Sequence, residues 1–167
     1  MNSLFEEFVW RLVDHLFPPP SYRVEAQERN WSVLWSATEN RSYRSIRPDV
    51  VVREAGGAGM CVAIDAKYKR YDMIDPSSAD IYQGFLYAQA YNATGQVLPP
   101  TGFLVYPASS PELKVEHVRL RRPNGERAGE LVILGLPVRL TLDTIDQPDS
   151  SPVATLRGEI AGALRSS

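Results

Sequence analysis

The stretch RPDVVVREAGGAGMCVAIDAKYKRY, residues 47–71, has two runs rich in aliphatic residues on either side of a glycine-rich turn. Residues 49–53 and 61–68 have the composition of strands. The three glycines of EAGGAGM permit the positive φ angles of a hairpin loop. The stretch therefore predicts an antiparallel β-hairpin, with two aspartates and a lysine at positions where a half-buried strand usually carries apolar side chains.

Charged residues of the second strand share one of its faces. Side chains alternate between the two sides of a strand, so Asp65 and Lys67 project from the same side. The residues between and beside them project from the other side and are suited to a core: Ile64, Ala66 and Tyr68. We therefore expect one chemical face and one core face.

The expected register of the hairpin brings the two aspartates together. If Arg53 pairs with Cys61, Asp49 lies opposite Asp65 on the face that carries Lys67. Cross-strand neighbours are roughly 5 Å apart, and like charges at that distance repel each other unless a cation lies between them. Magnesium prefers oxygen ligands and commonly takes one or two carboxylates. We expect a Mg²⁺ site at Asp49 and Asp65, with Mn²⁺ as a substitute.

A divalent cation beside a lysine favours hydrolysis of a phosphodiester bond. A bound metal ion polarises a phosphoryl oxygen and lowers the pKa of its water. The Lys67 ammonium would orient that water or balance the charge that develops on phosphorus. Structural interpretations stay open, because Asp49 after Pro48 suits a turn and Lys67 suits a strand edge protected by charge.

Composition indicates one globular domain, residues 1–167, with 44% hydrophobic and 23% charged residues. No apolar run approaches the ~18 residues of a membrane span, and the N-terminus does not have the pattern of a signal peptide. We therefore expect a cytoplasmic protein that does not contact a membrane. The single Cys61 makes no internal disulfide, and with the distant His15 and His117 it makes no zinc site.

Two basic clusters flank the aspartates, although the formal net charge is -2. One lies in RSYRSIR and the other in KYKRY. Arginines and lysines interleaved with tyrosines suit a phosphate backbone and its bases. We expect DNA contacts from four of these residues, with a solvated strand edge as the alternative: Arg44, Arg47, Lys69 and Arg70.

The segments before the hairpin predict a helix and then strands. Residues 3–17 carry apolar side chains at three- and four-residue spacing and end at a run of three prolines, so they predict a core-facing helix. Residues 22–37 predict one or two strands. The segment ATENRSYRSIR, residues 37–47, has the composition of a polar connection.

The segments after the hairpin continue the alternation of helices and strands. A helix is expected to begin at Asp75 or Ser77 and to stop at Gly95. Residues 101–107 form a short apolar strand of the kind buried in a mixed sheet. The core is expected to span about residues 3–107.

Residues 111–167 predict a second hairpin and a closing helix. KVEHVRLRR and ELVILGLPVRLTL surround Asn124-Gly125, which is a strong hairpin turn signal. A helix follows in VATLRGEIAGALRSS. The whole order predicts an α/β fold, a mixed β-sheet with helices packed on it.

These motifs resemble a known nuclease superfamily. Pro48-Asp49 followed by Asp65-Ala66-Lys67 resembles the motif of the PD-(D/E)xK nucleases, and Gln83 with Tyr87 resembles their Gln-x-x-x-Tyr element. More closely, LFEEFV, RPDVVV, IDAKYKRY, ADIYQGFLYAQAY and GFLVYP are similar, in this order, to the nuclease subunit (McrC-like) of McrBC-type modification-dependent restriction systems. These elements span roughly residues 4–107.

This resemblance implies a restriction-endonuclease-like fold and a Mg²⁺-dependent DNA endonuclease, the cleavage module of an anti-phage system. It implies that Asp49 and Asp65 bind the metal and that Lys67 is the catalytic lysine. Gln83 and Tyr87 would contact DNA or brace the metal site, with an ordinary pair on a helix surface as the alternative.

The acid of LFEEFV is identified by resemblance as a further site residue. Stepping ~100° per residue from Leu4 places Glu6 beside the apolar stripe and Glu7 nearly opposite to it, so Glu6 is the better candidate. Ser3 and Glu6 also fit a capping box at the start of the helix, which is the alternative.

The resemblance also implies partners. In those systems the subunit has an N-terminal portion that engages an AAA+ GTPase motor, whereas Met1 here lies three residues before the first nuclease element. We therefore expect either a shortened domain or one that works without the motor. Cleavage of both strands favours a homodimer. A non-cleaving DNA-binding or assembly module, and a nuclease for RNA or single strands, are the alternative functions.

Overall fold

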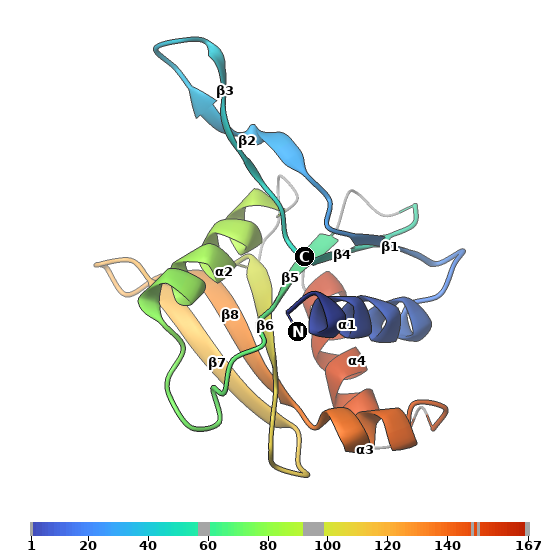
Figure 1. Cartoon of the computed structure of the whole chain (residues 1–167). Helices are drawn as coiled ribbons and strands as arrows, with labels where there is room; N and C mark the ends of the chain where they lie inside the picture. The colour runs from blue at the N-terminus through green and yellow to red at the C-terminus, as the bar shows by residue number, and fades with distance from the viewer. Residues whose placement is uncertain (1, 57–60, 92–98, 148, 150, 166–167) are drawn as a thin grey trace.

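Six strands form one mixed sheet in the order β1-β4-β5-β6-β8-β7 (Figure 1). The computed structural model describes residues 2–56, 61–91, 99–147, 149 and 151–165. The pairs β5–β6 and β6–β8 are parallel, and the other neighbours are antiparallel. The strands are β1 (Tyr22–Ala26), β4 (Val50–Glu54), β5 (Cys61–Ala66), β6 (Thr101–Pro107), β7 (Lys114–Arg121) and β8 (Arg127–Leu136). The predicted mixed sheet is confirmed.

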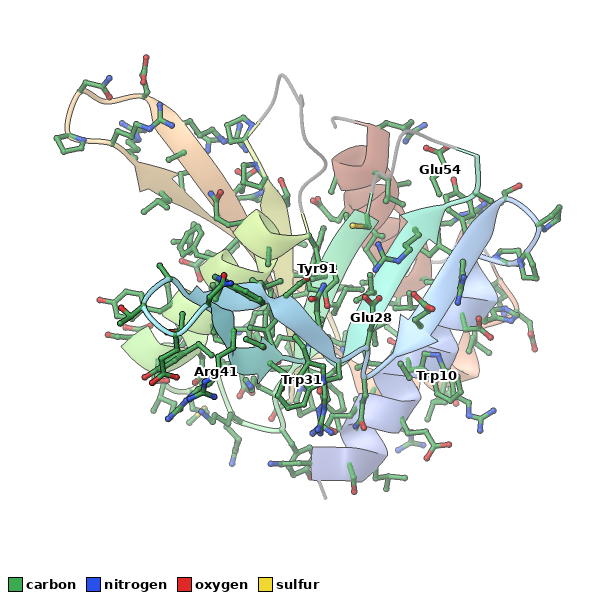
Figure 2. The ribbon with its side chains drawn as sticks, turned by 90° about the horizontal axis from the view of Figure 1, so that it is seen from above. Trp10, Glu28, Trp31, Arg41, Glu54 and Tyr91 are labelled. Carbon is green, nitrogen blue, oxygen red and sulfur yellow. The ribbon has the colours of Figure 1, made fainter. Side chains whose placement is uncertain are left out.

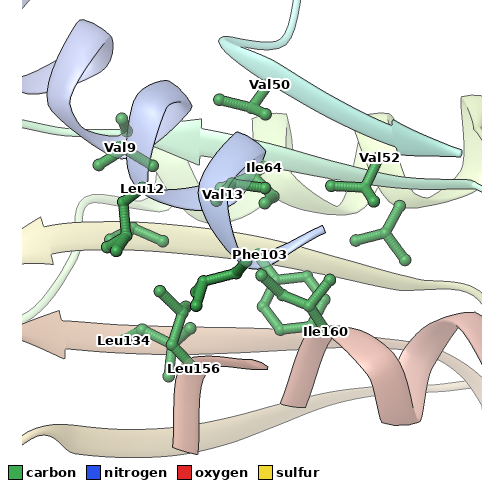
Figure 3. Packing of buried hydrophobic residues seen from close by; sticks show 14 of the residues in the cluster. Val9, Leu12, Val13, Val50, Val52, Ile64, Phe103, Leu134, Leu156 and Ile160 are labelled. Atoms are coloured by element: carbon green, nitrogen blue, oxygen red, sulfur yellow. The ribbon is translucent and has the colours of Figure 1, made fainter. Parts of the chain in front are cut away.

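Two helices cover one face of this sheet, α1 (Asn2–Leu16) and α4 (Ser151–Arg165) (Figure 1). Their apolar side chains pack against alternate residues of the strands, as Figure 3 shows for Leu12, Ile64 and Leu156. Each of these three side chains is at most 1% exposed. Burial of an aliphatic side chain of this size stabilises the fold by about 1.5–3 kcal/mol, so this layer fixes α1 to the central strands.

The opposite face of the sheet is covered by α2 (Ser78–Ala90). Ser77 is its N-cap, because the Ser77 side chain accepts a hydrogen bond from the backbone N–H of Asp80. This confirms one of the two predicted starts. The predicted stop at Gly95 lies outside the described residues. α2 packs on the face of the sheet that carries Asp65. The expectation that this face is the chemical one is therefore wrong for most of its length, because only the end of β5 presents charged side chains there.

Glycines let α2 lie directly on β6. A Cβ built on Gly102 would lie 2.8 Å from the carbonyl oxygen of Gly84 and 3.1 Å from the Cβ of Ala88. The first of these contacts is with helix backbone, which has no rotamer to change. Because Gly102 has no side chain, α2 can lie this close to β6.

Gly102→Ala should lower the free energy of unfolding by about 1–3 kcal/mol, because the added methyl pushes α2 off the sheet. Urea unfolding measures the change. Gly158→Ala is the matched control, because Gly158 lies in α4 with no heavy atom within 4 Å of its built Cβ. There alanine should stabilise by about 0.5–1 kcal/mol. Equal effects at the two positions would contradict the close approach of α2.

Residues 30–46 form a separate two-stranded ribbon, β2 (Asn30–Ser36) and β3 (Arg41–Ile46), which projects beyond the main sheet (Figure 1). The expectation of one or two strands in 22–37 is confirmed by β1 and β2. The expectation of a polar connection in 37–47 is wrong, since most of it is β3. Val33, Leu34 and the buried Ile46 hold the ribbon against the α2 side of the sheet, and this packing overrides the polar composition.

The C-terminal third completes the main sheet. The predicted hairpin at Asn124-Gly125 is confirmed, but its second strand ends at Leu136 and Val138–Asp143 is a helix, α3. Pro137 has no N–H for the ladder, so the predicted continuation as a strand was wrong. Because β8 pairs with β6 and α4 packs in the core, both elements are integral to the fold. Within the described residues, no helix has the length and apolar character needed to cross a membrane.

Candidate active site

The predicted site residues converge at the end of β5, beside the first turns of α2. The pairs Val50↔Ile64 and Arg53↔Cys61 have the expected hairpin register. Asp49 directly precedes β4 and lies across from the end of β5, where its Oδ2 accepts a hydrogen bond of 2.7 Å from the backbone N–H of Ala66. The antiparallel pairing thus places Asp49 beside the end of β5, which carries Asp65, as the sequence predicts.

Asp49 and Asp65 form a pair of acids with perturbed pKa values. Burial raises the pKa of Asp49 to about 6, with a further contribution from the charge of Asp65. Asp65 is 2% exposed, and burial raises its pKa above the ordinary value although the Lys67 ammonium opposes the rise. Two carboxylates that lose solvation and repel each other are a place where a cation would be stabilised.

Lys67 supplies the positive charge of the site. Its Nζ lies 2.9 Å from Oδ2 of Asp65 and donates a hydrogen bond of 3.1 Å to Oε1 of Gln83. Although burial opposes the charged form, the carboxylates of Asp65, Asp49 and Asp80 raise the pKa of Lys67 above its ordinary value. The side chain is therefore a fixed ammonium ion at neutral pH.

Gln83 and Tyr87 brace this arrangement from α2. While Gln83 Oε1 accepts from Lys67, its Nε2 donates to the hydroxyl oxygen of Tyr87 at 2.7 Å. The Tyr87 hydroxyl donates to the backbone carbonyl of Arg47 at 3.1 Å. The chain of contacts runs from the lysine to the segment that precedes Asp49. Of the three interpretations left open by the sequence, these contacts favour bracing of the site.

A further acid, Asp80, lies next to this network and was not singled out from the sequence. It is 6% exposed and accepts hydrogen bonds from Lys69 Nζ at 2.6 Å, from Ser77 and from Tyr71. Its Oδ1 is 4.0 Å from Lys67 Nζ. Although burial opposes ionisation, the hydrogen bonds from Lys69, Ser77 and Tyr71 lower the pKa of Asp80 to about 2. The only sequence signal was an acid in the first turn of a helix.

Asp80→Asn should lower the free energy of unfolding by about 1–3 kcal/mol at pH 7, because charge-assisted hydrogen bonds to a buried carboxylate are lost. The pKa of Asp80 in the folded protein lies below the ordinary value of 3.8, so the carboxylate stabilises the fold above that value and the contribution disappears as the pH falls toward 2. Urea unfolding between pH 7 and pH 2 should show the gap closing.

The exposed Asp75 provides the control for this experiment, since Asp75→Asn should change stability by less than about 0.5 kcal/mol. A gap between wild type and Asp80→Asn that stays constant down to pH 2 would show that ionisation of Asp80 does not stabilise the fold.

Glu6 lies on the side of α1 that faces the site. It accepts a hydrogen bond of 3.2 Å from Nε2 of Gln27, whose backbone N–H donates to the carbonyl of Asp49 at 2.8 Å. Glu6 and Asp49 line the same open hollow of about 330 Å³. Glu7 also lines the hollow but pairs with Arg11. The capping-box interpretation is not supported, because α1 begins at Asn2, before Ser3. Gln27, which joins Glu6 to Asp49, is a second residue that the sequence did not single out.

The predicted basic contacts separate into two kinds. Lys69 is tied to Asp80 and lies 5.7 Å from the ring centre of Tyr71. Arg70 is exposed, with one guanidinium nitrogen 3.5 Å from Oγ of Ser109. Arg44 and Arg47 are exposed on and directly after β3. The three arginines are therefore exposed to solvent, whereas Lys69 belongs to the α2 network.

A magnesium ion fits the donor set at Asp49 and Asp65. The ligand oxygens are hard carboxylate oxygens. Burial, with a further contribution from the charge of Asp65, raises the pKa of Asp49, so a cation would stabilise the ionised pair. In the part of the chain that the structure describes, no three His, Cys, Asp or Glu side chains gather as a metal cage. An ion here would thus complete its coordination with water, backbone and substrate oxygens, as Mg²⁺ usually does.

Comparisons with known proteins agree with this fold. A family model described as McrBC 5-methylcytosine restriction system component matches residues 1–107. Among solved structures, a chain of a Thermococcus gammatolerans tetradecameric assembly, McrB AAA+ hexamers with bound McrC, is 24% identical with a TM-score of 0.50. The match covers 81% of this chain and 27% of that chain, so the present sequence spans about a quarter of the length of the solved one. No curated protein matches.

Proposed function

Because the chain belongs to the McrBC 5-methylcytosine restriction system component family, we propose that it is the metal-dependent endonuclease of such a system and hydrolyses phosphodiester bonds in DNA. The observation that carries this proposal is the convergence of Asp49, Asp65 and Lys67 at one end of the sheet. A buried acid, a half-buried acid and a fixed ammonium ion destabilise the fold unless they are compensated, and metal-assisted phosphoryl chemistry would use all three groups.

The side chains of this chain have separate roles in the proposed reaction. Asp49 and Asp65 would hold Mg²⁺, with Mn²⁺ as a substitute, and the bound ion would act as a Lewis acid on the scissile phosphate. Lys67 orients the attacking water and balances the negative charge that grows on phosphorus. Gln83 fixes the Nζ of Lys67, and Tyr87 fixes the backbone before Asp49.

The cost of misplacing these groups explains why α2 braces them. A displacement of about 1 Å in a catalytic group can reduce a rate ~10²-fold. The contact between Gly102 and α2 described above sets the height of Gln83 over the sheet. Glu6, through Gln27, supports the opposite side of Asp49. We infer that it positions the metal-binding acid.

An AAA+ partner is part of the proposal. The solved relative is described in an assembly of McrB AAA+ hexamers with bound McrC, and we propose that a motor of this class delivers DNA to the present chain. Two copies of the site are needed to cut both strands of a duplex, so we expect two nuclease chains to act together. Cleavage is accordingly tested with the partner present as well as absent.

Calorimetric titration with MgCl₂ or MnCl₂ separates an enzyme from a non-cleaving scaffold. We expect saturable ion binding to the wild type and its loss in Asp65→Asn, because one of two carboxylate ligands becomes an amide. Plasmid DNA with the AAA+ partner and Mg²⁺ should be nicked or linearised, and EDTA should stop the reaction. Absence of metal binding in the correctly folded wild type would contradict the proposal.

A further inference from the structure

The β2–β3 ribbon carries an unusual distribution of apolar side chains. Its partly buried Val33 and Leu34 pack against the α2 side of the sheet and anchor it. The larger aromatic side chains point to solvent instead: Trp31 and Trp35 are each 55% exposed and Tyr43 is 65% exposed. Burial of aromatic rings would stabilise the fold more than burial of valine, so their exposure indicates a contact made outside the chain.

Positive charge accumulates on the same ribbon. Residues 27–47 contain four arginines and two glutamates, whereas the whole chain has a net charge of -2. Both glutamates are occupied by arginines: Glu28 binds Arg53 at 2.6 Å, and Glu39 pairs with Arg41. Figure 2 shows Trp31 and Arg41 on the ribbon and Glu28 near its base.

Three arginines of the ribbon segment remain free of carboxylates within the described residues: Arg29, Arg44 and Arg47. Two of them lie over exposed rings, Arg29 at 5.6 Å from the ring centre of Trp31 and Arg44 at 5.8 Å from that of Tyr43. A guanidinium stacked on an indole or phenol ring keeps its N–H donors available at its edge. Each such pair therefore offers a planar ring beside N–H groups that can donate hydrogen bonds to a phosphate.

This combination favours a nucleic-acid strand over a protein partner. Aromatic rings with arginines beside them suit the bases and phosphates of a strand, since bases stack on the rings and the cations contact the backbone. The ribbon also leads directly into the site, because Arg47 lies two residues before Asp49. A strand lying along the ribbon toward Arg47 therefore approaches Asp49.

We propose that the β2–β3 ribbon binds the DNA strand next to the cleavage site, with Arg29, Arg44 and Arg47 on phosphates and Trp31, Trp35 and Tyr43 on unpaired bases. The rings cannot stack on the faces of bases that are already stacked in a duplex, so this contact selects DNA that is locally opened or single-stranded. The inference rests on the proposed nuclease function and adds the form of the substrate.

The test measures binding separately from cleavage. Fluorescein-labelled single-stranded DNA and the matching duplex are titrated in EDTA, with wild type, a triple variant Trp31→Ala/Trp35→Ala/Tyr43→Ala, and a triple variant Arg29→Ser/Arg44→Ser/Arg47→Ser. Circular dichroism and urea unfolding check that each variant is folded. Arg121→Ser/Arg157→Ser is the control, because both arginines are exposed but lie on β7 and α4.

The aromatic variant should lose at least ~10-fold in affinity for single-stranded DNA, since one stacked base is worth ~5- to 100-fold, and should lose much less for the duplex. The arginine variant should weaken binding of both forms and reduce the slope of log K against log [salt] by about one per arginine in contact. The control should bind both forms as the wild type does. Tryptophan fluorescence of the wild type should be quenched by the single strand.

Equal affinity of wild type and both triple variants for single-stranded DNA, or no binding by wild type at low salt, would overturn the inference. Variants that bind DNA normally but no longer associate with the AAA+ partner would assign the ribbon to protein docking and also overturn it. Failure of the nuclease proposal gives a different pattern: DNA binding depends on the ribbon, but the wild type does not cut with Mg²⁺ and the motor.

Discussion

Lys67→Ala and Asp65→Ala should each reduce plasmid cleavage at least ~10²-fold, measured with Mg²⁺ and the AAA+ partner by the appearance of nicked and linear DNA. Removal of one preorganised donor to a developing negative charge typically costs ~10²–10³ in rate. Loss of Asp65 also removes one of the two proposed metal ligands. The effect is expected in the rate and not in DNA binding, because the ribbon arginines and not Lys67 are proposed to contact the backbone.

The fold should survive both substitutions. Removal of Asp65 alone leaves Lys67 near Asp80, and removal of Lys67 leaves two acids whose pKa values are already raised, so thermal unfolding must accompany each assay. Lys114→Ala is the control for loss of a lysine, since Lys114 is exposed on β7. Cleavage at the wild-type rate by both folded variants would remove the assignment of this site.

Asp49→Asn should stabilise the metal-free protein by about 2 kcal/mol at pH 7. Burial raises the pKa of Asp49 from 3.8 to about 6, and one pKa unit corresponds to about 1.4 kcal/mol. The full shift gives about 3 kcal/mol, which we reduce because part of the carboxyl remains solvated. An asparagine in its place still accepts the hydrogen bond of Ala66 without the repulsion from Asp65.

The sign of the pH dependence follows from the same shift. Between pH 4 and pH 6 the folded protein keeps the proton of Asp49 while the unfolded chain releases it, so wild-type stability should fall as the pH rises through this window. The variant lacks this contribution, and its advantage should grow over the same range. Urea unfolding in EDTA at a series of pH values measures the difference.

Magnesium should reverse the order of the two proteins. An ion that binds only the folded wild type adds about 2.7 kcal/mol at a concentration of 100 times its Kd, whereas the variant has lost a ligand. Wild type should therefore be the more stable protein in excess Mg²⁺ and the less stable in EDTA. The same ranking in both buffers would show that Asp49 does not hold the ion. Asp75→Asn, at an exposed position, should respond to neither condition.

Local patterns were sufficient for the hairpin and its charged face. Strand residues alternate with a period of two, and the pairing of Arg53 with Cys61 places Asp49 across from Asp65. The alternation follows from the sequence alone, whereas the register was assumed and is the one that the structure shows. Local patterns also predicted the limits of α1 to within one residue, Ser77 as one of two candidate caps of α2, and the turn at Asn124-Gly125.

The environment of the charged residues was not predictable in this way. Lys67 meets Gln83 and Asp80 only because β5 pairs in parallel with β6 and α2 packs over both strands. Asp80 gave no signal beyond an acid near a helix start, and Gln27 gave none. Such contacts join segments that are distant in sequence, and their geometry depends on how the complete core packs.

The sequence by itself determined that Asp65 and Lys67 share one side of a strand, because backbone geometry alone sets that alternation. Only the tertiary structure decided that α2 encloses those groups and that residues 30–46 form a projecting ribbon with exposed rings. It also decided that the C-terminal strands complete the sheet. The physical reason is that burial and pairing between distant segments depend on the whole packed chain, whereas periodicity is a property of a few neighbouring residues.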